Sequence, residues 1–200
     1  MLVSDQRISG GFRIGLGRAL RTRWVWLVAL AAPLAQSSTA EAQMAAVNIS
    51  FQPANFPLQT GYKGDHGQVF GSRGNGHSYG WNVSHTGRTF AYSALPGWEK
   101  TWGAAWSLIR MVPGPSTRWE IAVANGNYEV TILAAGYRCQ GQLQQIAAEG
   151  VLVVNGVAGW DYDTYVGGTQ QVTVQDGRLT VTNGPMAAEN CIDYIQVRPR

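Results

Sequence analysis

Apolar and polar residues alternate on both sides of two turn dipeptides in this chain. One is Asn125-Gly126 within WEIAVANGNYEVTI (Trp119 to Ile132), and the other is Asp176-Gly177 within QVTVQDGRLTV (Gln171 to Val181). Such a dipeptide between alternating runs is the strongest short-range sign of a β-hairpin. Two-residue turns would pair Val123 with Tyr128, Ile121 with Val130, Trp119 with Ile132, Val174 with Leu179 and Val172 with Val181, with Thr173 beside Thr180 on the reverse face. The pattern predicts an antiparallel sheet with one buried face.

Further short strands are predicted elsewhere, and long helical patterns are almost absent. The predicted strands are Val47 to Phe51, Leu108 to Val112, Val151 to Val154 before a tight turn at Asn155-Gly156, and Cys191 to Val197. The glycine-rich stretch from Gly61 to Asn82 is expected to form loops around one or two short strands. This spacing is typical of an all-β fold, a two-sheet antiparallel β-sandwich (jelly roll), with at most one or two short helices.

Three tryptophans, Trp98, Trp102 and Trp106, recur at every fourth position. This spacing would place them on one face of a short helix. The favoured interpretation is a helix that caps the sandwich and buries the tryptophans in the core. The alternative is an exposed aromatic platform for a sugar or a partner.

Residues 1 to 42 have the features of a secretory signal peptide. Five arginines precede a twelve-residue apolar stretch, Trp24 to Ala35, and a polar segment ending in Ala40-Glu41-Ala42 follows. The apolar stretch is too short to span a bilayer, for which about 20 residues are needed. We therefore expect a secreted or periplasmic protein whose residues 43 to 200 form one domain, the alternative being an uncleaved membrane anchor.

Loss of the signal peptide changes the charge of the protein. The segment contains five of the 15 Lys and Arg residues and two of the 12 Asp and Glu residues, which leaves 10 of each in the mature chain. A net charge of zero gives no support to a nucleic-acid or anionic-membrane partner.

Cys139 and Cys191 are the only cysteines. In an oxidising compartment an isolated pair is most simply a disulfide, and two buried free thiols are the alternative. Two cysteines alone do not make a zinc site, so no metal site is predicted from them.

Sequence patterns give weak support to catalysis. Gly76-His77-Ser78-Tyr79-Gly80 matches the G-x-S-x-G motif of esterases, but this motif requires an α/β sheet and a distant later histidine. His66, His77 and His85 lack metal-ligand spacing and are interpreted as solvated loop residues. Glu120 and Glu129 are expected close together on the outer face of the first hairpin, where a solvated surface is favoured over a glycosidase pair.

The segment GWDYDTYVGG, Gly159 to Gly168, combines aromatic and acidic residues in a predicted loop. Trp160 and Tyr162 are candidates to stack on a sugar ring, and Asp161 and Asp163 are candidates to accept hydrogen bonds from its hydroxyl groups. The two aspartates could instead provide oxygen ligands for Ca²⁺. No cofactor is otherwise predicted.

Six blocks of the chain together resemble a malectin-like module of the galactose-binding-domain-like group, found in secreted bacterial proteins. They are VNISFQP, GYKGDHG, YGWN, WEIAVANGNYEV, DGRLTV and NCIDYIQV, in this order over nearly the whole mature chain. The resemblance implies a jelly roll that binds carbohydrate through loop aromatics and acids. By position it implicates Tyr79, Trp81, Asn82, Tyr137, Arg138, Glu189 and Asn190. The chain departs from similar modules at Ala135-Gly136-Tyr137-Arg138, where they tend to carry Gly-Asp.

These observations predict a secreted, non-catalytic carbohydrate-binding module. The predicted contact residues are Tyr79, Trp81, Asn82, Tyr137, Trp160, Asp161, Tyr162, Asp163 and Asn190. One alternative is a small jelly-roll polysaccharide lyase or hydrolase, and another is an extracellular structural or adhesive protein. The sequence does not identify a protein partner.

Overall fold

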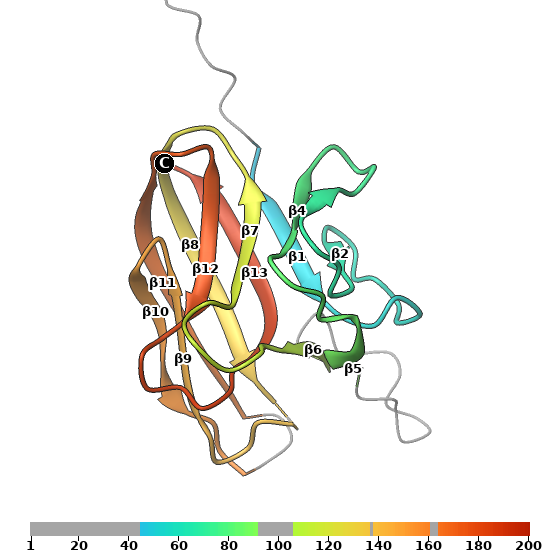
Figure 1. The fold of residues 1–200 in the computed structure, drawn as a ribbon, viewed down its shortest axis with the longest axis vertical. Helices are drawn as coiled ribbons and strands as arrows, with labels where there is room; N and C mark the ends of the chain where they lie inside the picture. The colour runs from blue at the N-terminus through green and yellow to red at the C-terminus, as the bar shows by residue number, and fades with distance from the viewer. Residues whose placement is uncertain (1–44, 92–105, 137, 161–163) are drawn as a thin grey trace, which may run out of the picture. The chain divides into compact units, whose positions relative to one another are not determined.

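The computed structural model describes residues 45–91, 106–136, 138–160 and 164–200. These residues form two β-sheets whose apolar faces pack against each other (Figure 1), which confirms the predicted all-β sandwich. A 3₁₀ turn at Thr86–Arg88 is the longest helical segment among them. The predicted signal peptide and two of the three spaced tryptophans, Trp98 and Trp102, lie outside the described residues. Trp106 is half-buried immediately before a strand.

The first sheet, sheet A, is centred on the last strand of the chain. Its order is β11 (Tyr165–Val174), β8 (Gly126–Ala135), β13 (Cys191–Pro199), β1 (Val47–Phe51) and β2 (Lys63–Asp65). Two short strands, β6 (Ser107–Arg110) and β5 (Thr89–Ala91), continue the sheet from the beginning of β13. The pairing of β1 with β2 is parallel, and the other pairings in sheet A are antiparallel.

The second sheet, sheet B, faces sheet A across the core. Its order is β10 (Val151–Val157), β9 (Leu143–Ala148), β12 (Arg178–Asn183), β7 (Arg118–Ala122), β4 (Ser78–Trp81) and β3 (Gly71–Ser72). All five pairings in it are antiparallel.

The two predicted hairpins are wrong in their pairing. β7 and β8 lie in different sheets, and so do β11 and β12. β7 pairs with β12, which sets Ile121 opposite Leu179 and Trp119 opposite Val181, while β8 pairs with β11. Each turn therefore crosses from one sheet to the other, because alternation specifies which side chains are buried and does not specify the partner strand.

The burial predicted from the same alternation is confirmed. All ten apolar residues assigned to the inner face are at most 7% exposed: Trp119, Ile121, Val123, Tyr128, Val130, Ile132, Val172, Val174, Leu179 and Val181. They belong to one hydrophobic cluster that fills the space between the sheets. Inward side chains of both sheets meet there, so the same residues are buried whether the strands pair or face each other.

The β7–β8 and β11–β12 connections bind each other at one end of the sandwich. The backbone N–H of Val123 donates to the carbonyl of Gly177 at 3.1 Å, and the N–H of Gly177 donates to Oδ1 of Asn125 at 2.7 Å. Gly177 has a φ of +81°, a left-handed conformation that favours glycine. The chain therefore bends at both dipeptides, but each bend joins strands of different sheets.

A genuine two-residue hairpin joins β9 to β10. Its turn is Glu149-Gly150, with φ values of 49° and 75°, and Ala148 pairs with Val151 beside it. Asn155-Gly156, predicted as a turn, lies inside β10. Positive φ at both turn positions is typical of the turns that join hairpins, but glutamate rarely adopts it, which is why the sequence does not indicate this turn.

Cys139 and Cys191 form the predicted disulfide, with Cα atoms 6.1 Å apart. The bond ties the segment after β8 to the first residue of β13. Among the described residues, no helix is long and apolar enough to cross a membrane.

Candidate functional site

The predicted contact residues Tyr79 and Trp81 lie in the core. Both side chains of β4 are fully buried, and their polar atoms are occupied. The Tyr79 hydroxyl donates to the carbonyl of Gly64 at 2.8 Å, and Trp81 Nε1 donates to Oδ1 of Asp65 at 3.0 Å. Because neither ring has a face open to solvent, we withdraw both residues as stacking groups.

Asp65 organises this buried aromatic cluster. Its Oδ1 accepts from Trp81 and from the backbone N–H of Gly67 at 2.8 Å, and its Oδ2 accepts from Trp119 Nε1 at 2.9 Å. Burial raises the pKa of this carboxyl, while the three N–H donors and Arg73 act in the opposite direction. The Phe51 ring lies edge-on to the rings of Trp81 and Trp119. The cluster supports the fold and offers no surface to a ligand.

His85 also belongs to the core, which corrects its interpretation as a solvated residue. Its ring is stacked on Trp81, with centroids 4.0 Å apart. Nε2 accepts from the N–H of Val112 at 3.1 Å, so Nδ1 carries the proton and donates to the carbonyl of Val83 at 2.7 Å. Burial is the main cause of its lowered pKa. With both nitrogens occupied, His85 is not available as a general base.

The two predicted asparagine contacts hold backbone segments together. Asn82 donates to the carbonyl of Ser116 at 2.8 Å and accepts from the N–H of Arg118 at 3.0 Å. Asn190 is fully buried, and its amide binds both the N–H and the carbonyl of Gln145 at 2.7 and 2.6 Å. These hydrogen bonds use the amide groups internally, so we withdraw both residues as ligand contacts.

Trp160 is the predicted contact residue that the structure places at the surface. Its side chain is 80% exposed, and its carbonyl accepts from Nε2 of Gln140 at 2.6 Å. The indole lies against the backbone of Gly141: a Cβ on that glycine would lie 2.5 Å from Cζ2 of Trp160. Gly141 has a φ of +67°, in the left-handed region. Glycine is therefore favoured at this position both by the backbone conformation and by the close approach of the indole. Tyr137, Asp161, Tyr162 and Asp163 lie outside the described residues.

The segment beneath Trp160 is fixed to the rest of the domain. The N–H of Gly141 donates to the carbonyl of Ala158 at 2.9 Å, and the N–H of Ala158 donates to the carbonyl of Gln142 at 3.2 Å. The Cys139–Cys191 disulfide attaches the same segment to β13. We call residues 138–141 together with Trp160 the tryptophan platform.

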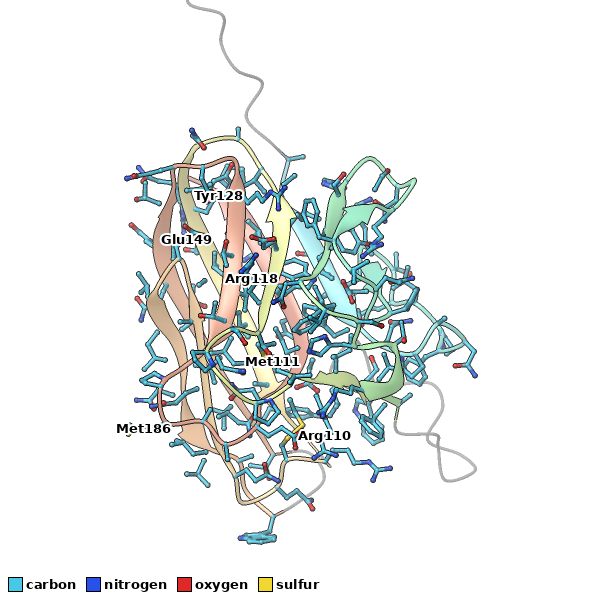
Figure 2. The ribbon with its side chains drawn as sticks, in the orientation of Figure 1. Arg110, Met111, Arg118, Tyr128, Glu149 and Met186 are labelled. Atoms are coloured by element: carbon cyan, nitrogen blue, oxygen red, sulfur yellow. A yellow bond between two sulfur atoms is a disulfide. The ribbon has the colours of Figure 1, made fainter. Side chains whose placement is uncertain are left out.

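Beside the disulfide lies a cluster of arginine side chains around Glu189, which we call the arginine cluster. Glu189 accepts from Arg88 Nη1 at 3.0 Å and from Nε and Nη2 of Arg110. The guanidinium of Arg138 lies 4.7 Å from the centre of the Phe90 ring, and that of Arg110 lies 5.9 Å from it. Arg110 is paired with Cys191 in the sheet, and Figure 2 shows it close to the disulfide.

Sequence reasoning named two members of the arginine cluster and missed three. The family resemblance placed Arg138 and Glu189 near the site. Arg88, Phe90 and Arg110 carry no local signal, because they reach Glu189 and Arg138 only through the pairing of β5, β6 and β13.

The carboxyl group of Asp193 is buried without a hydrogen-bond partner. The residue is fully buried at a bulge in β13, and neither carboxyl oxygen has a partner in the described chain. Burial raises its pKa well above the ordinary value. Burial therefore favours the neutral form of this carboxyl group over the charged form.

Glu120 and Glu129, predicted as near neighbours, lie on different sheets. Glu120 of β7 is paired with Arg118 and Arg178, and Glu129 of β8 is paired with Arg198 and Arg200. They therefore cannot form a glycosidase pair across two strands. No group of three or more His, Cys, Asp or Glu side chains that could hold a metal occurs within the described ranges.

Comparison with solved structures shows which folds this chain is similar to. The protein YxiM from Bacillus subtilis matches with a TM-score of 0.55 and 20% identity over 78% of this chain and 40% of its own length. Bacteroides uniformis β-glucuronidase 2 matches with a TM-score of 0.53 and 13% identity, over 78% of this chain and 18% of its own length. At these identities the two matches show the fold alone.

A family 35 carbohydrate-binding module from Clostridium thermocellum also matches, with 13% identity over 56% of this chain and 89% of the module. Its TM-score of 0.35 is below the level that shows a shared fold. A scan against protein-family models finds no match, and neither does a search of curated proteins.

Proposed function

We propose that this chain is a secreted, non-catalytic carbohydrate-binding module of the malectin-like type. The ligand is a polysaccharide or oligosaccharide held at the tryptophan platform. The supporting observation is an indole that is 80% exposed and lies against Gly141, on a segment attached to β13 by a disulfide. An exposed aromatic ring offers a flat apolar surface on which the C–H face of a sugar can stack.

The tryptophan platform is suited to binding because little conformational entropy of its backbone would be lost when a ligand binds. The segment is held by backbone hydrogen bonds to Ala158 and by the disulfide, so the backbone of the platform is already ordered before a ligand binds. Tyr162, Asp161 and Asp163 follow Trp160 directly in the sequence and are proposed to surround the sugar. A calcium ion at these aspartates remains part of the hypothesis, tested by binding in the presence of a chelator.

Secretion agrees with the disulfide, since such bonds persist in oxidising compartments. Binding is favoured over glycoside cleavage by the positions of four acids in the described part of the chain. Glu120 and Glu129 lie on opposite sheets, and Asp65 and Asp193 are fully buried. Acid and base catalysis would need a pair of carboxyl groups on both sides of an accessible bond.

The proposal is tested with the Trp160→Ala variant. Affinity electrophoresis on a panel of plant, algal and bacterial polysaccharides should show retardation of the parent protein. We expect the variant to bind its ligand about tenfold more weakly, with an unchanged melting temperature because the ring is exposed.

The matched control is Val69→Ala, which shortens another exposed apolar side chain, 53% exposed, beside β4 and therefore near the opposite edge of sheet B from β10. It should leave retardation unchanged. Failure of the parent protein to bind any polysaccharide, or equal binding by the Trp160→Ala variant, would contradict the proposal.

A further inference from the structure

The arginine cluster and the tryptophan platform are linked through residues 138–141. Arg138 lies over Phe90 in the cluster, and two residues later Gln140 binds the carbonyl of Trp160. Cys139, between them, is bonded to Cys191, which is paired with Arg110 in the sheet. The disulfide thus joins the two features at the beginning of β13.

The arginine cluster has an excess of positive charge. Arg88 and Arg110 share the single carboxylate of Glu189, whose side chain is only 13% exposed. The two arginine side chains are 38% and 35% exposed. Glu189 therefore lies beneath them and orients them, while it neutralises one of the two charges.

The exposed guanidinium groups still have donors to offer. A guanidinium carries five N–H bonds, of which Arg88 uses one and Arg110 uses two on Glu189. Within the described part of the chain, these two guanidinium groups have no further hydrogen-bond partner. Planar guanidinium groups match the two oxygens of a carboxylate, with which they form charge-assisted hydrogen bonds.

We propose that this surface selects acidic polysaccharides, and that the arginine cluster binds the carboxylate of a uronic acid next to a sugar stacked on Trp160. This inference rests on the proposed carbohydrate-binding function and specifies its ligand class. The other arginines of the described ion pairs, Arg118, Arg178, Arg198 and Arg200, share Glu120 and Glu129 in the middle of other strands, away from the tryptophan platform.

The same chain contains a matched control for the arginine cluster. Arg178 pairs with Glu120 at 3.1 Å and lies over the Phe70 ring at 4.2 Å, so its chemistry resembles that of the cluster. It lies at the beginning of β12, where it pairs with Ala122 of β7, and not in the later part of β12 that pairs with β9. Arg178→Gln should therefore not affect binding.

The experiment compares binding to polygalacturonate with binding to the same polymer after its carboxyl groups have been reduced to alcohols. We expect the full chain to bind the acidic polymer at least about tenfold more tightly, and added salt to weaken this binding. Arg88→Gln should remove most of the preference, while binding to the reduced polymer stays the same.

Arg138→Gln is a second variant, which keeps the Arg88–Glu189 and Arg110–Glu189 ion pairs. It should also reduce the preference for the acidic polymer over the reduced polymer. Thermal denaturation of each variant verifies its folding. Equal binding of the two polymers by the parent, or an unchanged preference in both arginine variants, would overturn the inference.

The outcomes also separate this inference from the proposed function. If the parent binds both polymers equally and Trp160→Ala binds neither, the function holds and the ligand class is wrong. If the parent binds no polysaccharide, the proposed function itself fails. Tighter binding to a sulfated neutral polymer than to polygalacturonate would overturn the assignment of a carboxylate.

Discussion

At the residue scale, Asp193 is expected to make the folded state less stable as the pH rises. Burial raises its pKa in the folded protein well above 3.8, the ordinary value. Between these two values the folded state keeps a proton that the unfolded chain has lost, so the free energy of unfolding falls with rising pH. Above the raised pKa the fold contains a buried charge without a partner, which is the least favourable condition.

Asp193→Asn removes this titration. We predict that the variant is more stable than the parent at neutral pH and that the difference shrinks as the pH approaches 3.8. Urea denaturation of both proteins at a series of pH values measures the difference. A difference that does not change with pH would show that Asp193 titrates alike in the folded and unfolded states.

Some residue positions could be predicted from the sequence, and others could not. The burial of Trp119 and Tyr128 follows from alternation, which reports the inner face directly. Trp81 and Trp160 have opposite environments, although each lies near glycine residues and aromatic neighbours. What separates them is tertiary: Trp81 hydrogen bonds to Asp65, whereas Trp160 rests on the surface of Gly141.

At the element scale, the disulfide holds the tryptophan platform to β13. The bond closes a separation of 52 residues, and in the chain-entropy model it contributes on the order of 4 kcal/mol to stability. We predict that the double variant Cys139→Ala/Cys191→Ala unfolds with a free energy lower by about 3 to 4 kcal/mol. Its affinity for polysaccharide should also fall, because Gln140 and Gly141 lose their attachment.

Denaturant unfolding and affinity electrophoresis test both effects. Parent protein treated with a reducing agent is the control, since it loses the bond and keeps both cysteine side chains. If binding and stability are retained in the double variant, the backbone hydrogen bonds of Gly141 and Ala158 alone hold the segment.

The strands could be located from the sequence better than the pairs they form. β1, β6, β7, β8, β12 and β13 all lie where alternating or apolar runs predict strands. The partners could not be predicted, because a tight turn can lead back along the same sheet or across to the other. The chain crosses to the other sheet at Asn125-Gly126. The hairpin at Glu149-Gly150 has a glutamate with positive φ, a residue that is uncommon in such a turn.

At the scale of the whole molecule, β13 joins parts of sheet A that come from distant regions of the chain. It lies between β8 and β1, and it also pairs with β6. We predict that deletion of residues 191–200 abolishes cooperative thermal unfolding, because β1 and β8 then have no common neighbour and the disulfide is lost. Near-ultraviolet circular dichroism of the tryptophans measures the transition.

The control for this deletion removes Arg200 alone. Arg200 pairs with Glu129 at the surface, where Arg198 also reaches the same carboxylate. Such exposed pairs contribute about 0 to 1 kcal/mol, so a native transition should remain. A native transition in the longer deletion would show that sheet A forms without its central strand.

The candidate site is also a property of the whole molecule. Arg88, Arg110 and Glu189 come from three separate regions of the sequence and meet through the pairing of β5, β6 and β13. Sequence spacing could identify Trp160 as a candidate but could not identify the arginines, since each looks like an ordinary surface residue. Of the residues in the arginine cluster, the resemblance to malectin-like modules implicates only Arg138 and Glu189.

The pairing of β1 with β13 determines which end of the sandwich would face outward if the domain were tethered at one terminus. Val47 lies opposite Val197, so the chain enters and leaves the sandwich side by side, at the end where Tyr128 pairs with Pro199. The disulfide and Trp160 lie beyond the other end of β13, which begins at Cys191. A linker attached at either terminus would therefore leave the tryptophan platform pointing away from whatever the domain is joined to.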